Sequence, residues 1–485
     1  MNPPSPPPAQ KPSVTWNPAL LWVSGGALVL FIIGAFGLFL LITRTEPLAQ
    51  RLVREARSFH GDDWPRPSHH EPAVPGRFAE ALTPLLPELE LMPELSPSEL
   101  TCPRGEDALY EDEGRYDVDA ELFAHEQARV ELEEQCLLVS RGEAPLDTAP
   151  WECLEQLRTH RGLLHRVLAT TRTQLGGLPE QLGSLARPVD EEPAGLALLE
   201  RVARLAALET QVLRAEGRPE EAVDTCLDGL ALSRELSLGA GMYGLSMSAR
   251  SHDVLFLPCA AALEAAPVER QRQALEQLAR LRQGYPPLSV VLREESVYQQ
   301  LFNYGELLSP PALDALPEPA QELVSGRDSY YYYRSPGTYP RLQPYVWRRN
   351  AAMFDEMVAA ADLPAEQRGR AFASIDVAQS LLLQEQAWRA QDYNAQAQAR
   401  EDQRHQALAL AALVEAHLSR AEQGTWPEQL SPLVAGTLFL EADNSLEAWL
   451  VPGYAVSGVP ELRLTARQPP PAPPWPRYVG GGGLR

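Results

Sequence analysis

The sequence contains one lysine and few cysteines, and it has fewer basic than acidic residues. Lys11 is the single lysine, and 42 basic residues face 65 acidic ones across 485 residues, which leaves a formal net charge of −23. Binding to nucleic acid requires a basic surface that neutralises phosphates, so this balance argues against nucleic acid as a partner. With 45% hydrophobic and 22% charged residues, the composition is otherwise that of a folded globular protein.

Cysteine is scarce and does not form a recognisable framework. Cys102, Cys136, Cys153, Cys226 and Cys259 are an odd set without C-x-x-C spacing, so they do not decide the redox compartment. Cys226 and Cys259 fall in apolar helical patterns, where a buried free thiol is the commoner state. Cys136 and Cys153 could form a disulfide in an oxidising compartment.

A complete catalytic motif is also missing. Residues 239–244, Gly-Ala-Gly-Met-Tyr-Gly, fit G-x-G-x-x-G, but the dinucleotide site follows a strand and the segment before them is helical. Close helix packing or a loop is the expected role. Ser246 and Ser248 lie near His252 and Asp253 without forming G-x-S-x-G, so we expect them to be structural. We predict no cofactor and no catalytic residue.

One apolar run is long enough to cross a bilayer. No charged residue interrupts 19–42, and about 20 residues at ~1.5 Å each span a hydrocarbon core of ~30 Å. Trp16 and Trp22 near its start and Arg44 after its end are typical of membrane interfaces. A signal peptide would have a basic start and a shorter apolar region. We therefore predict a single-pass helix that contacts the lipid bilayer through residues 19–42.

Charge alone does not decide on which side of the membrane the rest of the chain, which we call the body, lies. Arg44, Arg51, Arg54 and Arg57 follow the apolar run, whereas Lys11 precedes it, and this excess favours the cytoplasm. Domains well beyond about 60 residues translocate largely regardless of their charge, so the rule is weak for this chain.

Two polar segments follow the apolar run. Prolines at 65, 67, 72 and 75 prevent a long helix in the first, and we expect a solvated juxtamembrane linker, with a metal site as the alternative. In 88–134, sixteen acidic residues face three arginines. Calcium is an alternative there, but Leu122 stands where an EF-hand needs glycine, so we expect an acidic solvated face and no metal. The metal site considered for the first segment would use residues of the types that bind metal ions, which are His60, Asp62, Asp63, His69, His70 and Glu71.

From residue 150 onward, apolar residues recur three and four apart, which predicts a mostly α fold of helical hairpins. The expected helices are 151–168, 194–215, 220–236, 251–266, 268–282 and 289–307, followed by a broken helical region over 365–422. Short strands are expected at 437–440, 448–451 and 462–464.

The hairpin over 208–236 resembles a tetratricopeptide repeat. In Ala-Glu-Gly-Arg-Pro-Glu-Glu-Ala, residues 215–222, Gly217 stands where the first helix of a repeat ends and Ala222 where the second packs closely. An array needs about three such units and only one is convincing, so the other hairpins are expected to be less regular.

The C-terminal part resembles the helix-to-head junction of pseudopilins. In 423–430, Gln-Gly-Thr-Trp-Pro-Glu-Gln-Leu, Gly424 can cap a helix that Pro427 prevents from continuing. The prepilin cleavage signature is missing before residue 19. Over 150–460, the order of features resembles uncharacterised membrane-anchored helical proteins of GC-rich planctomycetes and myxobacteria, which implies an envelope setting and brings no reaction.

An irregular segment supplies the candidate partner-binding residues. Residues 325–350 are rich in tyrosine and arginine, and aromatic side chains beside arginines make recognition surfaces for peptides or sugars. The alternative is a long loop that covers a seam between helices. The candidates are Tyr330, Tyr331, Tyr332, Tyr333, Arg334, Tyr339, Tyr345 and Trp347.

These features give the expected domain order. It is a disordered Pro-rich tail (1–18), a transmembrane helix (19–42), a juxtamembrane connector (43–87), an acidic segment (88–149), a helical-hairpin domain (150–308), a Pro/Tyr/Arg-rich insert (309–350), a long helical region (351–422), a small strand-bearing unit (423–467) and a disordered Pro/Gly tail (468–485).

The predicted function is that of a non-catalytic scaffold or adaptor. It is tethered to the inner membrane and binds a peptide or protein partner on a helical concave surface. The alternatives are an envelope hydrolase that acts on cell-wall material and a component related to a pilus or secretion assembly. Size and the resemblance favour a periplasmic body.

Overall fold

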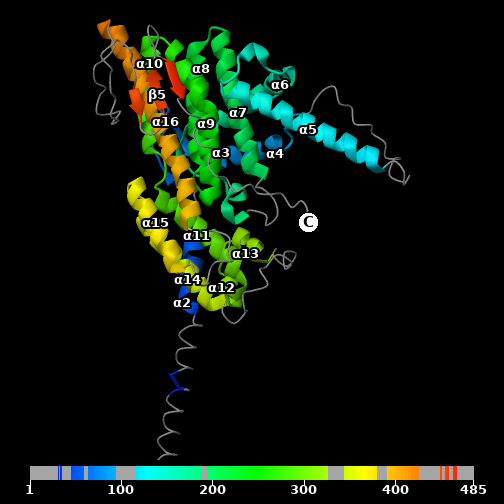
Figure 1. The fold of residues 1–485 in the computed structure, drawn as a ribbon, viewed down its shortest axis with the longest axis vertical. Helices are drawn as coiled ribbons and strands as arrows, with labels where there is room; N and C mark the ends of the chain where they lie inside the picture. Colours follow the sequence, from blue (N-terminus) through cyan, green and yellow to red (C-terminus); the bar gives the residue numbers. More distant parts are fainter. Residues whose placement is uncertain are drawn as a thin grey trace, which may run out of the picture.

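The computed structural model (Figure 1) describes most of the helical body. The described residues are 31, 33–34, 45–58, 64–93, 95, 115–186, 194–325, 343–379, 390–424, 448–450, 454–457 and 463–466. Both predicted tails, most of the predicted span 19–42 and the expected strand 437–440 lie outside them. In the part of the chain that is described, no helix combines the length and apolar character needed to cross a bilayer.

The fold is mostly helical, as the periodicity predicted. The helices are α2 (Glu46–Arg57), α3 (Phe78–Leu82), α4 (Leu86–Glu90), α5 (Arg115–Ser140), α6 (Trp151–Thr170), α7 (Ala194–Ala215), α8 (Pro219–Leu236), α9 (Gly241–Ala265), α10 (Val268–Gln283), α11 (Leu288–Tyr304), α12 (Pro310–Leu313), α13 (Glu318–Ser325), α14 (Gln343–Ala360), α15 (Ala365–Gln379) and α16 (Ala390–Gln423). Short 3₁₀ turns lie at Thr83–Leu85, Leu146–Thr148, Glu180–Leu182, Ser184–Ala186 and Gly305–Leu307.

Most of the predicted helices have the expected bounds. Helix α7 begins and ends as predicted, and α6, α8 and α10 differ by one or two residues at an end. Gly217 between α7 and α8 has φ 75°, and the N–H of Arg218 donates to the carbonyl of Leu213, which is how a left-handed glycine closes a helix. Helix α9 is longer than predicted because it begins at Gly241, inside the glycine-rich segment.

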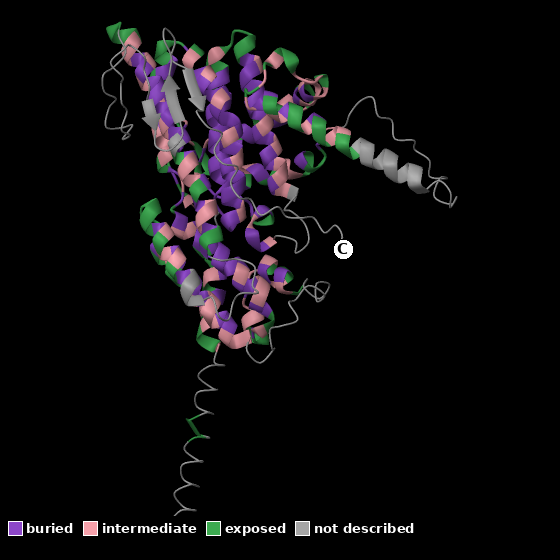
Figure 2. Cartoon of the chain, viewed as in Figure 1, coloured by how far each residue is buried: buried purple, intermediate pink, exposed green. Residues whose placement is uncertain are grey.

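Helices α7 to α10 form the main core together with α16. Their buried apolar residues belong to one cluster, which also takes in parts of α5 and α6. Figure 2 shows the buried residues concentrated in the helices at the centre of the body. Helix α16 packs on α9 and α10, and it contributes the buried Ala/Leu/Val residues 409–414 to this cluster. The surface that α9 and α10 turn towards α16 is therefore covered by the chain itself.

Two smaller clusters lie at the other end of α16. One joins α2, α11, α13 and α14 and contains the fully buried Trp347. The other joins the beginning of α9 to α11, α14, α15 and the first turns of α16. Tyr393 of α16 packs edge-on against Phe354 of α14, with ring centroids 5.5 Å apart. Helix α16 thus connects the main core to the end of the body that contains α2.

The expectation of a solvated connector at 43–87 is wrong for its described residues. This segment forms α2, β1 (Trp64–Pro65), β2 (Val74–Arg77) and α3, and it buries Arg66, His69 and Phe78. Strand β3 (Thr173–Gly176), which follows α6, pairs antiparallel with β1 and parallel with β2. Prolines prevented a long helix there, as expected, but β3 supplied a strand partner from about a hundred residues away.

A second small sheet lies near the C-terminus. Strands β4 (Ala448–Leu450), β5 (Tyr454–Ser457) and β6 (Arg463–Ala466) form an antiparallel meander. Strands β4 and β6 overlap two predicted strands, whereas β5 was not predicted. The sheet contacts α16 through β4 and β5.

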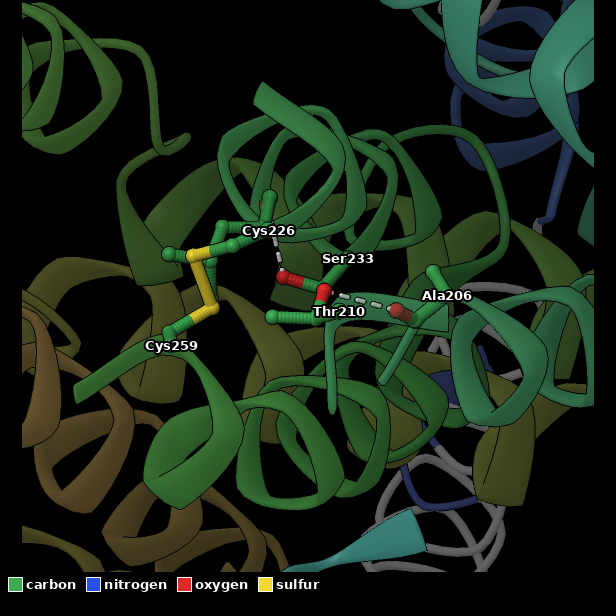
Figure 3. Close-up of a disulfide and its surroundings, with 6 residues drawn as sticks. Ala206, Thr210, Cys226, Ser233 and Cys259 are labelled. Atoms are coloured by element: carbon green, nitrogen blue, oxygen red, sulfur yellow. Dashed lines mark hydrogen bonds between the residues drawn. A yellow bond between two sulfur atoms is a disulfide. The ribbon is translucent and has the colours of Figure 1, made fainter. Parts of the chain in front are cut away.

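Two disulfides join neighbouring helices. Cys136 links α5 to Cys153 of α6, with Cα atoms 5.8 Å apart. Cys226 of α8 links to Cys259 of α9, with Cα atoms 5.3 Å apart (Figure 3). The expectation of free buried thiols at 226 and 259 is therefore wrong. Helices α8 and α9 can approach closely because Gly229 faces Leu255, where an added Cβ would lie 2.8 Å from a methyl carbon.

Candidate functional site

Six ionisable side chains gather where the connector crosses α8, and we call them the ionic core. Two come from the connector, one from the turn after α6 and three from α8. All are buried except one, whose side chain is 31% exposed. The six are Arg66 and His69, then Arg172, which is the partly exposed one, and Asp228, Arg234 and Glu235.

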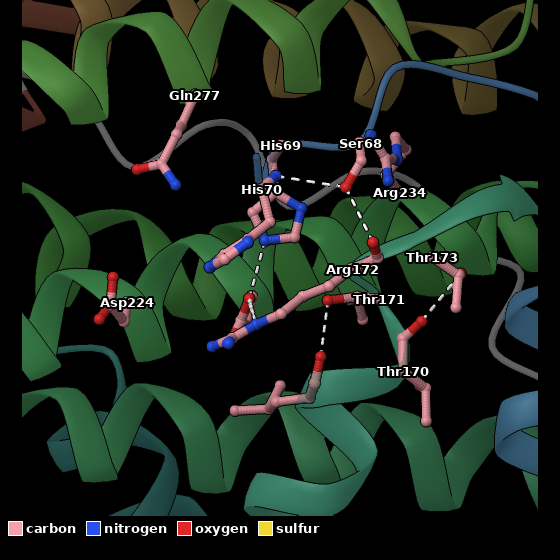
Figure 4. A network of polar contacts seen from close by, with 12 residues as sticks. Ser68, His69, His70, Thr170, Thr171, Arg172, Thr173, Asp224, Arg234 and Gln277 are labelled. Carbon is pink, nitrogen blue, oxygen red and sulfur yellow. Dashed lines mark hydrogen bonds and ion pairs between the residues drawn. The ribbon is translucent and has the colours of Figure 1, made fainter. Parts of the chain in front are cut away.

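In one half of the ionic core, Asp228 contacts both His69 and Arg172, and Figure 4 shows these two side chains close together. The Oδ1 atom of Asp228 is 2.7 Å from Nε2 of His69, and Arg172 donates to its Oδ2 from Nη2 at 2.6 Å. Burial alone would raise the pKa of Asp228, but the hydrogen bonds from His69 and Arg172 hold that pKa below its usual value. Burial lowers the pKa of His69, so a neutral imidazole donates to an ionised carboxylate.

Glu235 occupies the other half of the ionic core. It lies 2.7 Å from Nε of Arg66 and accepts a 2.7 Å hydrogen bond from Nη2 of Arg234, and all three side chains are fully buried. Arg66 also donates to the carbonyl of Thr173 at 2.6 Å. Burial lowers the pKa of Arg66 to about 10, still well above neutrality. The guanidinium of Arg66 therefore remains charged and holds the connector against β3 and α8.

Two glycines make room for these arginines. A Cβ on Gly176 would lie 2.7 Å from Nε of Arg66, and one on Gly284 would lie 2.8 Å from Nη1 of Arg234. Larger residues at these positions would displace the guanidinium groups. The sequence therefore provides the space for the ionic core as well as its charges.

The ionic core has the chemistry of a structural clamp. The hydroxyl of Ser68 donates to the carbonyl of Arg172 at 2.9 Å, so the serine next to His69 is engaged with the backbone. Nδ1 of His69 is buried without a hydrogen-bond partner among the described residues. An acid–base pair needs a route to a substrate, and both members of the His69–Asp228 pair are enclosed in protein.

Two of the described metal-ligand types of the connector have separate partners in the structure. His69 is committed to Asp228, and Glu71 pairs with Arg280 at 2.8 Å. No group of three His, Cys, Asp or Glu side chains suited to a metal ion occurs within the described residues. His60, Asp62 and Asp63 lie outside them.

The Ser/His/Asp residues of α9 contact α16. Nδ1 of His252 is 2.8 Å from Oε1 of Gln406, and Nε2 of Gln406 donates to Asp253 at 2.9 Å. Gln403 donates to the hydroxyl of Ser248 at 2.9 Å. Burial lowers the pKa of His252 to about 4. These pairs set the register of α16 on α9, which is a structural role.

The glycine-rich segment 239–244 is occupied by carboxylates of the same chain. The N–H groups of Gly239 and Gly241 donate to Oε2 of Glu294 at 3.1 and 3.3 Å, and that of Met242 donates to Glu295 at 3.1 Å. Burial raises the pKa of Glu294 to about 8. Backbone N–H groups that would face a phosphate in a dinucleotide site therefore face α11.

The predicted partner-binding residues are only partly described. Residues Tyr330 to Arg334 and Tyr339 lie outside the described part of the chain, and Tyr345 is half-buried on α14. Trp347 is fully buried, donates from Nε1 to Gln300 at 3.0 Å and stacks on Tyr304. In this structure Trp347 is a core residue rather than a contact surface.

An open hollow lies on the surface between α4 and α6, and the sequence analysis did not identify it. Leu91, just after α4, is 81% exposed beside it. Gly162 leaves its floor open, since nothing lies within 4 Å of a Cβ built there. Its lining consists of Glu88, Leu91, Thr159, His160, Gly162, Leu163 and Arg166. Helical periodicity places 159, 162 and 166 on one face of α6, but it could not bring α4 to that face.

The chain was compared with known protein families, with curated proteins and with solved structures, and none of them matches it.

Proposed function

We propose that this protein is a membrane-tethered helical scaffold that binds a protein or peptide and does not catalyse a reaction. The observation that carries the proposal is the use of its ionisable residues. Polar side chains that could in principle take part in catalysis or bind a metal instead hold helices or the connector together; they are His69, Asp228, Ser248, His252 and Glu294. Such a body presents surfaces rather than a reaction centre.

The proposed location is the inner membrane, with the body on the periplasmic side. The uninterrupted apolar run 19–42 supports the anchor. Phe31 and Ile33 within it are exposed, as side chains that face lipid would be. Two disulfides support the periplasm, because intramolecular disulfides persist in oxidising compartments and are rare in the cytosol. The resemblance to envelope proteins of GC-rich bacteria agrees with this location.

In this proposal the partner does not bind to the concave groove that the helical hairpins led us to expect. Helix α16 packs on α9 and α10, so the side of the hairpins that it covers is not open. The hollow between α4 and α6 is the best described alternative, because Leu91 exposes an apolar side chain beside a charged rim of Glu88 and Arg166. An apolar centre with a polar rim is the usual anatomy of a protein–protein interface.

Co-purification tests the binding function. The full chain would be solubilised from membranes and its bound proteins compared between wild type and Leu91→Asp. Leu363→Asp is a matched control, because Leu363 is also an exposed leucine and lies before α15. We expect a stoichiometric partner that Leu91→Asp reduces by about tenfold or more, as for a buried interface anchor, and that Leu363→Asp retains. Absence of any stoichiometric partner would contradict the scaffold.

Thiol counting tests the compartment. Cells would be treated with a thiol-blocking reagent during lysis, and blocked cysteines counted with and without prior reduction. Two disulfides leave one of the five cysteines to react without reduction. Reaction of all five without reduction would place the body in the cytoplasm.

A further inference from the structure

The end of the body that contains α2 is joined to the predicted membrane helix by very few residues. The apolar run ends at Ile42 and α2 begins at Glu46. Three intervening residues can span only about 10 Å at ~3.5 Å each. The helices that α2 packs against must therefore stay close to the bilayer.

Helix α2 is fixed firmly to that end. Its buried face, Ala49, Leu52, Val53 and Ala56, packs into the cluster formed by α11, α13 and α14. On its other side, Arg51 forms a two-pronged ion pair with Asp355 of α14, in which Nη1 donates to Oδ2 at 2.7 Å. Arg57 donates to the carbonyl of Ala315 at 2.6 Å.

The chain outside the described residues adds an independent observation at the same end. Helix α13 ends at Ser325 and α14 begins at Gln343, and both pack in the cluster that holds α2. The sequence between these two helices, residues 326–342, contains five tyrosines and three arginines, a composition typical of segments that meet lipid headgroups.

The opposite end of the body is far away. Helix α16 has 34 residues and is therefore roughly 50 Å long at ~1.5 Å per residue. It starts beside α14 and ends beside the beginning of α10, where Arg272 pairs with Glu422 at 2.9 Å. Figure 1 shows α2, α12 and α14 at one end of the long axis and α10 at the other.

We propose that the end formed by α2, α12, α13 and α14 is a lipid-docking surface, which rests directly on the bilayer and holds the body upright. The proposal rests on the anchor within the proposed function. It goes beyond that function in two ways. It names a second contact, with lipid headgroups, and it sets how far each surface of the body lies from the bilayer. The hollow between α4 and α6 is then held away from the headgroups, accessible to a soluble partner.

Energy transfer to labelled headgroups tests this docking. The full chain, with Cys102→Ser and both disulfides intact, would be reconstituted in vesicles that contain an acceptor dye on a lipid headgroup. A donor dye would be placed on Asp314→Cys, after α12, or on Gln273→Cys, in the first turns of α10. Both original side chains are exposed, so neither change should affect folding, and disulfide content would confirm this.

We expect transfer from position 314 to exceed that from 273 several-fold. Insertion of a long flexible Gly/Ser linker after Thr43 should leave most of this difference in place, because the contact with headgroups, in addition to the short tether, holds this end on the surface. Equal transfer from both positions, or a difference that the linker abolishes, would overturn the proposal. A value at 314 that responds only to an added protein would assign this end to a protein partner. Co-purification remains a separate readout, so loss of the partner and loss of docking are distinguishable.

Discussion

Replacement of Asp228 by asparagine would remove the negative charge on which His69 and Arg172 converge. The asparagine oxygen can still accept from Nε2 of His69, but the ion pair with Arg172 is lost. Removing one partner of a buried ion pair costs about 3–5 kcal/mol. Because the side chain of Arg172 is 31% exposed, water can solvate part of its charge, so we expect a loss at the lower end, about 3 kcal/mol.

The same helix provides a matched control one turn away. Asp224 pairs with Arg270 at 2.7 Å, but its side chain is 51% exposed. Arg270 itself is buried, but it also donates to Gln277 at 2.8 Å, and water reaches the pair through Asp224. A pair that water reaches contributes about 0–1 kcal/mol, so we expect Asp224→Asn to cost about 1 kcal/mol, well below the cost of Asp228→Asn.

Urea unfolding of the detergent-solubilised chain, followed by tryptophan fluorescence with disulfides intact, would measure both variants. The hydrogen bonds to Asp228 hold its folded pKa below the usual value of 3.8. Its contribution is thus complete above that pH and is lost as pH falls through the folded pKa. The difference between wild type and Asp228→Asn should accordingly shrink in acid. Equal stability of the two asparagine variants at neutral pH would refute the buried clamp.

Three further predictions concern helix contacts. Glu294 has a pKa raised from 4.5 to about 8, so the stability that its protonated form provides is lost as pH rises between these values. Glu294→Gln should flatten the dependence of the unfolding free energy on pH in this range, and an unchanged dependence would contradict the burial of this carboxyl. The Cys226–Cys259 bridge closes a separation of 33 residues, so Cys259→Ala should lower the unfolding free energy by about 3–4 kcal/mol in urea, and a stability equal to wild type would show that the bridge is not formed. Gly229→Ala should cost about 1–3 kcal/mol by crowding Leu255, whereas a neutral result in the same assay would mean that α8 and α9 can separate without loss.

The helices were predictable because their signals are local. Apolar spacing and the prolines and glycines between segments placed α6, α7, α8 and α10 within two residues of their bounds. The start of α9 was missed for a physical reason. Its start is stabilised by Glu294 and Glu295, which lie more than fifty residues later. The sequence of the segment itself therefore does not indicate that a helix begins there.

The ionic core could not be predicted from the sequence. Prolines in the connector indicated an exposed linker, and nothing near His69 or Arg66 identifies a partner. Burial of these two side chains depends on Asp228 and Glu235, which are well over a hundred residues away. Similarly, Cys226 and Cys259 sat in patterns typical of free buried thiols, and only the packing of α8 against α9 brought their sulfurs together.

Sequence alone determined the mostly helical class, the acidic charge and the order of the helices, because each of these follows from composition or from residues a few positions apart. On the same local basis it predicts the anchor. Tertiary structure decided which polar groups are buried, which cysteines pair, that α16 covers α9 and α10, and that α2 is fixed to α14. These depend on long-range packing, in which a residue's surroundings come from segments that its neighbours in sequence do not specify.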